Sequence, residues 1–274
     1  MNGKISPETS ALSTTMLIPL WAKAVEQERP EDERLLTDAE APRMLAQIDY
    51  DFSKFNNIVM SQVGCCGRAH IFDEEARRFI AAHPDAVVVQ LGAGLDARYE
   101  RLGRPAITAW YDLDLPEVIA LRRQLLPESS NHYLGSSMLD ESWMQTAAAH
   151  GKPVLLLCEG VLMYFSNEMV RGLFQNLAAR FHGGEIAFDM CNSWTVKNSA
   201  RHDAMKHVSA RFESFCDNVR EPEQWADNLH FISNRYIVGD FPAEWKRIGF
   251  VPSLIMRLVR VIRESSRMLH YRID

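Results

Sequence analysis

The sequence predicts an α/β fold with a doubly wound sheet, and two observations support this. Short apolar runs at residues 86–91 (AVVVQL) and 153–158 (PVLLLC) suit strands that are covered on both faces. Segments in which apolar residues recur with helical spacing lie between such runs. Strands that alternate with helices in this way form a sheet with helices on both faces and right-handed crossovers.

Two further strands and two helices complete the predicted framework. Residues 107–111 lead into an acidic segment, and residues 185–190 follow a Gly-Gly turn. Ser166 is a preferred N-cap residue type, and the apolar residues after it recur on one helical face: Val170, Leu173, Phe174, Leu177, Ala178 and Phe181. Another helix before the first strand is indicated by Phe72, Ala76, Phe79 and Ile80.

The chain of 274 residues has the length of one large domain, and we predict a single domain over residues 1–274. Residues 1–65 have a mostly helical pattern and precede the first strand, so we expect an N-terminal helical cap there. Residues 192–240 form a long polar and aromatic stretch. A segment of this length is more typical of an active-site cover than of a structureless loop. It is therefore predicted to form an inserted substrate cap.

The composition excludes several classes of protein. With 47% hydrophobic residues the chain can bury a core without disulfides or a metal, and its net charge of −6 argues against a nucleic-acid partner. No run approaches the ~18 apolar residues of a membrane span. The odd number of irregularly spaced cysteines fits neither a disulfide framework nor a zinc site, and no secretion signal is visible. We expect a cytoplasmic protein with reduced thiols at Cys65, Cys66, Cys158, Cys191 and Cys216.

The strongest local motif is a glycine turn directly after the first predicted strand. In the run 91–98 (LGAGLDAR), Gly92 and Gly94 allow a tight turn and a close approach of the backbone to a ligand. The next strand ends, about twenty residues later, in Asp112-Leu113-Asp114, where a carboxylate can accept both hydroxyls of a ribose. The two features together predict a cofactor that contains a nucleoside.

The class of this cofactor stays open at this point. The spacing Gly92-x-Gly94-x-x-Ala97 fits a nicotinamide or flavin dinucleotide and S-adenosylmethionine (SAM) equally well. Asp96 favours SAM, because a carboxylate beside the turn would repel a pyrophosphate. SAM has no phosphate and carries a positive sulfonium. A glycine turn that binds no cofactor is the remaining alternative.

Three runs occur in order on the predicted strands: residues 87–102 (VVVQLGAGLDARYERL), 111–119 (YDLDLPEVI) and 155–165 (LLLCEGVLMYF). Together they resemble the leucine carboxyl methyltransferase family. Residues 17–24 and Gly249-Phe250 extend the similarity over most of the chain, toward the bacterial polyketide O-methyltransferase branch of the tetracenomycin type. The resemblance implies a class I SAM-dependent methyltransferase fold, Rossmann-like, with a mostly parallel seven-stranded sheet whose last strand is antiparallel.

The resemblance also implies a set of contacts to SAM, which would leave as S-adenosyl-L-homocysteine (SAH). Gly92 and Gly94 would pass under its methionine part. Asp114 matches the acid of the family that binds the ribose, and Asp112, two residues earlier on the same strand, is expected to assist.

Four more residues match positions that contact the cofactor in the family. Arg68 matches an arginine that pairs with the methionine carboxylate, a task suited to a planar bidentate donor. Glu159 matches a glutamate that helps hold the amino acid end. Ser137 and Met138 stand where eukaryotic members have an Asp-Leu pair at the adenine, so a neutral hydroxyl replaces a carboxylate. Asp140 would substitute for that carboxylate if the loop is shifted.

The implied reaction is an in-line displacement, in which the enzyme aligns the nucleophile and excludes water. An acceptor carboxylate is already ionised at neutral pH, whereas a phenol with a pKa near ~10 benefits from a base such as histidine. We expect His202, His207 and His230 to be solvated rather than to act as a base. No HxH or HExxH spacing predicts a metal site.

Arg98, Tyr164 and Lys23 are the predicted acceptor-binding residues. Arg98 and Tyr164 lie just after strand ends, where they can steer an anionic acceptor, and Lys23 lies in the run 17–24. The alternative is that Arg98 pairs internally with a carboxylate such as Asp96 while Tyr164 packs. The C-terminal arginines are predicted to form a solvated face: Arg257, Arg260, Arg263 and Arg267.

The sequence therefore predicts a SAM-dependent O-methyltransferase. Its expected acceptor is a carboxyl or hydroxyl oxygen of a small, polyketide-like molecule, and neither nucleic acid nor a membrane is an expected partner. Two alternatives remain: an NAD(P)-dependent oxidoreductase and a non-catalytic SAM-binding protein.

Overall fold

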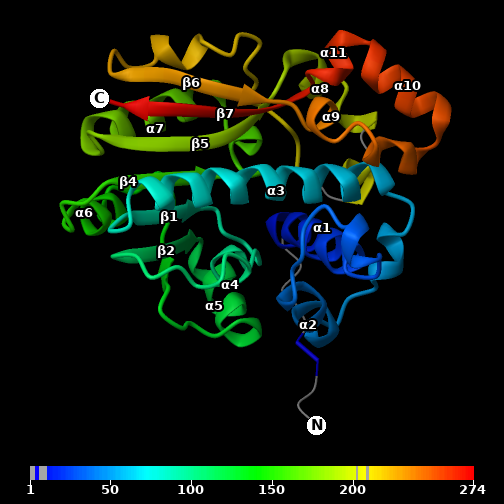
Figure 1. Cartoon of the computed structure of the whole chain (residues 1–274), viewed down its shortest axis with the longest axis horizontal. Helices are drawn as coiled ribbons and strands as arrows, with labels where there is room; N and C mark the ends of the chain where they lie inside the picture. Colours follow the sequence, from blue (N-terminus) through cyan, green and yellow to red (C-terminus); the bar gives the residue numbers. More distant parts are fainter. Residues whose placement is uncertain (1–3, 6–10, 202, 208–209) are drawn as a thin grey trace.

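The computed structural model describes residues 4–5, 11–201, 203–207 and 210–274. Its centre is a seven-stranded sheet with the strand order β3-β2-β1-β4-β5-β7-β6 (Figure 1). Neighbouring strands from β3 to β5 are parallel, and β7 is antiparallel to both β5 and β6. The strands are β1 (Val87–Leu91), β2 (Ala109–Asp114), β3 (His132–Gly135), β4 (Val154–Cys158), β5 (Gly184–Cys191), β6 (Leu229–Arg235) and β7 (Ser266–Ile273).

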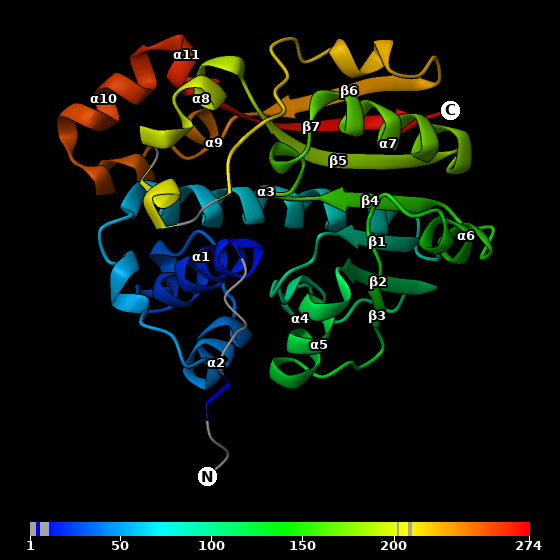
Figure 2. The same ribbon diagram turned by 180° about the vertical axis from the view of Figure 1, so that it is seen from behind.

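Helices cover both faces of the sheet and one of its edges (Figures 1 and 2). Short 3₁₀ turns join many of them. The α-helices are α1 (Ala11–Glu26), α2 (Glu40–Gln47), α3 (Val59–Ala82), α4 (Arg98–Arg101), α5 (Pro116–Leu125), α6 (Ser142–Ala148), α7 (Asn167–Arg180), α8 (Ser193–Lys197), α9 (Ile237–Asp240), α10 (Phe250–Leu258) and α11 (Arg260–Arg263).

A buried core lies on each face because side chains alternate along the central strands. Val88 of β1 belongs to the core that includes α1 and α3, and Val87 and Val89 belong to the core that includes α6 and α7. All five residues of β1 and of β4 are buried. The sheet thus holds the carboxyl ends of β1, β2 and β4 rigidly.

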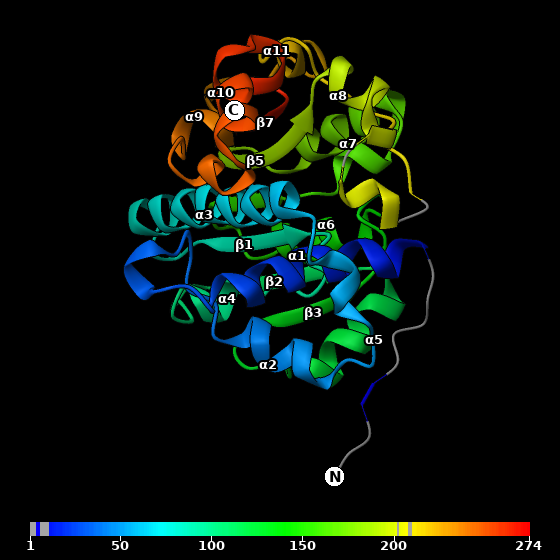
Figure 3. The ribbon, with the colours of Figure 1, turned by 90° about the vertical axis from the view of Figure 1, so that its right-hand side faces the viewer.

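The four predicted strands and the helix after Ser166 are confirmed. The strands are β1, β2, β4 and β5, and Ser166 Oγ accepts a hydrogen bond of 3.2 Å from Met169 N at the start of α7. The predicted helix before β1 is the long α3, so the expected cap boundary at residue 65 lies inside a helix. Figure 3 shows α1 and α2 in front of the strands, at their carboxyl ends.

Residues 192–240 differ from the expected single cap. Residues 193–207 contain α8 and two 3₁₀ turns, and several of them cover the strand ends. Leu229–Arg235 is instead β6, an edge strand that pairs with β7. Trp225 packs against Phe174 of α7 with a centroid distance of 5.0 Å. The half-exposed, polar sequence of β6 lacks the apolar run that identifies a central strand.

Arg267 is not part of a solvated face. It lies buried on β7, where one guanidinium nitrogen donates to the carbonyl of Cys216 at 2.5 Å. Arg257 and Arg260 are exposed, as predicted, whereas Arg263 is partly buried. No helix in the described part of the chain has the length and apolarity needed to cross a membrane.

Candidate active site

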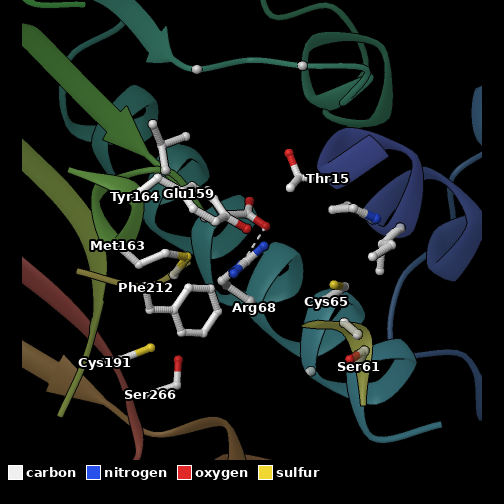
Figure 4. A pocket seen from close by; sticks show the side chains of 18 of the residues that line it. Thr15, Ser61, Cys65, Arg68, Glu159, Met163, Tyr164, Cys191, Phe212 and Ser266 are labelled. Atoms are coloured by element: carbon white, nitrogen blue, oxygen red, sulfur yellow. Dashed lines mark hydrogen bonds and ion pairs between the residues drawn. The ribbon is translucent and has the colours of Figure 1, made fainter. Parts of the chain in front are cut away.

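A large cavity opens at the carboxyl ends of the parallel strands (Figure 4). Its volume is about 920 Å³, near the upper end of the usual range for small-molecule sites. Residues of α1 and α3, the loops after β1, β2, β3 and β4, and the segments around α8, α10 and α11 line it. The N-terminal helices and part of the 192–240 segment thus meet over the strand ends.

The glycine turn forms one end of this cavity. Gly92 and Gly94 have φ angles of 68° and 51°, a region that favours glycine. A Cβ atom on Gly92 would lie 2.3 Å from Cγ2 of Val161, so no larger residue fits without movement. Both glycines line the cavity, and their backbone is therefore open to a ligand.

Asp114, at the end of β2, closes the same end of the cavity. Its Oδ2 accepts a hydrogen bond of 2.7 Å from Gly94 N, and its Oδ1 accepts one of 2.7 Å from Leu115 N. Burial raises the pKa of Asp114, although these hydrogen bonds oppose the shift. The carboxylate oxygens have further lone pairs and can accept hydroxyl groups of a ligand.

Asp112 does not lie at the cavity, which corrects the expectation that it assists Asp114. It is completely buried, and its Oδ2 lies 3.2 Å from a guanidinium nitrogen of Arg122. It also accepts hydrogen bonds of 2.7 Å from Asn131 Nδ2 and 3.1 Å from Trp110 Nε1. Through its contact with Arg122, the Asp112 carboxylate holds α5 against β2.

Ser137 and Met138 line the cavity in the turn after β3. Ser137 Oγ accepts a hydrogen bond of 3.2 Å from Leu139 N. Asp140 is not among the lining residues. Its Oδ2 accepts hydrogen bonds of 3.1 Å from Ser137 N and 2.8 Å from Ser136 Oγ. Asp140 therefore stabilises the turn and does not line the cavity.

Arg68 and Glu159 form an ion pair in the lining of the cavity (Figure 4). Arg68 Nε donates to Glu159 Oε1 at 3.0 Å, and Arg68 Nη1 donates to Asp189 Oδ2 at 3.2 Å. Burial would raise the pKa of Glu159, but the charges of Arg98 and Arg68 hold it below its usual range. The cavity thus presents one cation and one anion within hydrogen-bond reach of each other.

Arg98 is not available to an acceptor, which corrects the predicted role. Its side chain is completely buried, and it does not line the cavity. It donates to Asp73 Oδ1 at 2.9 Å and to Glu159, and it lies 3.1 Å from Asp96 Oδ2. The internal pairing considered from the sequence is what occurs, and Arg98 holds Glu159 from behind.

Lys23 and Tyr164 both line the cavity. Lys23 Nζ of α1 donates to Asp96 Oδ1 at 2.7 Å. Burial would raise the pKa of Asp96, but Arg101, Lys23 and Arg98 hold it well below its usual range. Burial raises the pKa of Tyr164 to about 12, so its hydroxyl stays protonated at neutral pH.

The other end of the cavity is largely apolar and aromatic, and the sequence motifs did not predict it. Tyr164 packs edge-on against Phe212 with a centroid distance of 5.7 Å (Figure 4). The segments that supply this end are far apart in sequence, so no local pattern connects them. The principal side chains are Met60, Trp194, Phe212, Trp245 and Ile255.

None of the described lining residues is a histidine. His230 lies on β6, where Nε2 is 3.3 Å from Asp274 Oδ2, and it does not reach the cavity. His202 and the side chain of His207 lie outside the described residues.

Comparisons with known proteins agree with this geometry. The family model described as leucine carboxyl methyltransferase matches residues 16–178. The "Tetracenomycin polyketide synthesis O-methyltransferase TcmP" of Streptomyces glaucescens is 32% identical, over 94% of this chain and 95% of its own. The "S-adenosyl-L-methionine-dependent methyltransferase dpfgK" of Gibberella zeae is 26% identical, over 89% of this chain and 88% of its own.

Solved structures support the fold. A SAM-dependent methyltransferase from Anabaena variabilis has a TM-score of 0.52 at 11% identity, covering all of this chain and 99% of its own. A DUF574 family protein from Streptomyces avermitilis has a TM-score of 0.56 at 12% identity, covering 94% of this chain and 97% of its own. The fold is that of the class I SAM-dependent methyltransferases, and SAM is the cofactor rather than a dinucleotide. The chain is a SAM-dependent methyltransferase that belongs to the leucine carboxyl methyltransferase family.

Proposed function

We propose that the protein transfers a methyl group from SAM to an oxygen atom of a small, mostly apolar natural-product acceptor, and that this oxygen belongs to a carboxylate. The observation that carries the proposal is the division of the cavity. One end presents the glycine turn, Asp114 and the Arg68–Glu159 pair, and the other is apolar and aromatic. The similarity to a polyketide O-methyltransferase of Streptomyces glaucescens supports an acceptor of this class.

The residues at the polar end fit SAM. Asp114 offers a carboxylate to the ribose hydroxyls beside the open backbone of Gly92 and Gly94. Arg68 and Glu159 offer opposite charges to the carboxylate and ammonium groups of the methionine part. Ser137 and Met138 lie after β3, where they would contact the adenine.

When bound, SAM supplies an electrophilic methyl group on a positive sulfur. The chain's own residues then hold the two reactants in line and keep water away. Phe212 and Trp194, from the segment after β5, and Trp245 cover the apolar end of the cavity. The Lys23–Asp96 ion pair fixes α1 against the turn after β1 and completes this part of the cavity wall.

The choice of a carboxylate follows from the weak acids that line the cavity. Burial raises the pKa of Tyr164 and of Cys191 to about 12 and also raises that of Cys65. None of these groups is poised to remove a proton at neutral pH, and none of the lining residues that the structure describes is a histidine. An acceptor that is already ionised needs no such base.

The test is a methyl-transfer assay with labelled SAM and a matched pair of acceptors, a polycyclic aromatic carboxylic acid and the phenol with the same rings. We expect the carboxylic acid to be methylated, with kcat/KM constant between about pH 6 and pH 9, where a carboxylate is fully ionised. The product, an ester, should release labelled methanol in alkali.

An alkali-stable product whose rate of formation rises with pH would show transfer to a hydroxyl group and overturn the carboxylate assignment. Methylation of neither acceptor, by protein that binds SAH, would contradict an aromatic small-molecule acceptor. A variant that tests the apolar end of the cavity is Trp194→Ala, which removes part of the apolar lining. It should raise KM for the acceptor more than KM for SAM.

A further inference from the structure

The segment from α10 to α11 exposes an unusual set of apolar side chains. Of the ten large apolar side chains that are exposed in the described residues, seven lie between residues 250 and 261. Phe250 is 79% exposed and Leu258 is 71% exposed. We call this set the apolar face, and its members are Phe250, Val251, Leu254, Ile255, Leu258, Val259 and Val261.

The apolar face is one side of an amphipathic element. Phe250, Leu254 and Leu258 follow one another at intervals of four residues, so they form one stripe along α10. Ser253 and Met256 lie on the opposite side and are buried. Figures 1 and 2 show α10 and α11 at an outer corner of the molecule, with no other helix or strand beyond them.

Basic residues outnumber acidic residues around the apolar face. Residues 245–263 contain two lysine or arginine residues before α10 and three arginines in α10 and α11, and no acidic residue. Arg257 is exposed, and the side chain of Arg260 is 80% exposed. The acidic residues that flank this segment, Glu244 and Glu264, are mostly buried and pair with Arg247 and Arg260. Glu264 Oε1 accepts a hydrogen bond of 2.9 Å from Arg260 Nε. Arg257 adds an exposed positive charge. This basic segment stands out in a chain with a net charge of −6.

The charge pattern distinguishes the partners that could cover this face. A second copy of the chain, docked through the same face about a twofold axis, would bring the arginines of the two copies together. An anionic lipid surface accepts both features at once, since apolar side chains enter the acyl boundary and arginines contact the headgroups. We propose that the apolar face docks the protein, without spanning, on an anionic lipid surface.

This docking goes beyond the methyl-transfer activity, but it has a consequence for the cavity. The same segment lines the cavity with Ile255, Met256 and Ile262. Docking therefore places one wall of the cavity against the lipid boundary. An apolar acceptor dissolved in the lipid would then reach the cavity without crossing water.

The experiment is flotation of the full-length protein with vesicles of phosphatidylcholine that contain about one third phosphatidylglycerol, against vesicles of phosphatidylcholine alone. We expect binding to the anionic vesicles that weakens as salt is raised. Phe250→Ser with Leu258→Ser should weaken it by about tenfold for each substitution. Arg257→Ala with Arg260→Ala should weaken it by about fivefold for each charge removed.

Matched controls lie elsewhere on the surface. Met169→Ser removes an apolar side chain that is 43% exposed on α7. Arg43→Ala removes an arginine that, like Arg260, is exposed and pairs with a glutamate three or four residues away. Both controls should bind vesicles as the wild type does. SAH affinity should be unchanged in all variants, because none of the substituted residues lines the cavity.

Three outcomes would overturn the proposal. The first is a wild-type protein that does not float with anionic vesicles. The second is flotation that the Phe250 and Leu258 substitutions leave unchanged. The third is a concentration-dependent dimer, seen by analytical ultracentrifugation, that the same substitutions dissociate; this would assign the apolar face to a second copy of the chain.

Discussion

Asp112 and Asp114 lie two residues apart on β2, yet only Asp114 lines the cavity, while Asp112 is completely buried against Arg122. We expect Asp112→Asn to lower the free energy of unfolding by about 3 kcal/mol, because a buried guanidinium loses its counter-charge. Chemical denaturation measures this. SAH affinity of the folded variant should stay within about twofold of the wild type, because Asp112 does not line the cavity. A twofold change corresponds to less than about 1 kcal/mol.

The control for this substitution is Asp85→Asn, which removes an exposed carboxylate that pairs with Lys152 at 3.0 Å. It should change the free energy of unfolding by less than about 1 kcal/mol. A stable Asp112→Asn variant with weak SAH binding would instead return Asp112 to the cofactor site.

Arg98 is expected to act by positioning Glu159. Its guanidinium touches both Asp73 and Glu159, a geometry that the single ammonium of lysine cannot reproduce. We therefore expect Arg98→Lys to raise KM for SAM by about tenfold and to leave KM for the acceptor nearly unchanged. Steady-state kinetics with each substrate varied in turn checks this. A rise in the KM of the acceptor alone would indicate direct acceptor binding.

Gly92→Ala should destabilise the fold as well as the site. The new Cβ would lie 2.3 Å from Val161 at a φ of 68°, and each effect is unfavourable. We expect the free energy of unfolding to fall by about 2 kcal/mol. Gly172→Ala is the matched control, since a Cβ at that position of α7 meets nothing within 4 Å. It should be neutral or stabilising; equal losses in both variants would contradict the argument.

His270 should make stability depend on pH. Its Nδ1 lies 2.8 Å from Glu75 Oε2 and its Nε2 lies 2.7 Å from Glu185 Oε2. Burial alone would lower the pKa of His270, but the two carboxylates raise it above the ordinary value. A raised pKa in the folded state stabilises the fold fully below the unfolded value, and this stabilisation is lost as the pH rises through the folded-state pKa.

The measurement is the difference in unfolding free energy between the wild type and His270→Gln. It should be largest at about pH 5.5, below the ordinary histidine pKa of about 6.5, and should decrease above it. Glu75, whose pKa is lowered to about 2 with help from His270 and Arg78, remains ionised throughout. A difference that does not change with pH would show that His270 stays neutral.

The strands that the sequence predicts are those buried on both faces. β1 and β4 are continuous apolar runs because helices cover both of their sides. β3 is a short edge strand, β6 is half-exposed, and β7 buries Arg267 and His270 in polar contacts. Their sequences follow neither the apolar nor the alternating pattern, so the motifs on β1, β2 and β4 could not reveal them.

The same distinction holds for the site. The glycine turn and Glu159 directly follow strands and Asp114 ends one, so their motifs place them at the cavity. The apolar end combines residues such as Met60 and Trp245, which only the tertiary fold brings together. Arg68 reaches the cavity as its motif predicts. For Arg98 the sequence left two alternatives open, and only the fold, which surrounds it with three carboxylates, decides between them.

The most direct test is calorimetric titration of SAH into the wild type and into Asp114→Asn, with Glu117→Gln as the control for an exposed carboxylate nearby. Loss of a charged hydrogen-bond acceptor should weaken binding by about tenfold or more in Asp114→Asn, and the control should bind as the wild type does. Equal affinities of the wild type and Asp114→Asn, both folded, would contradict the assignment of the cavity beside Gly92 to the cofactor.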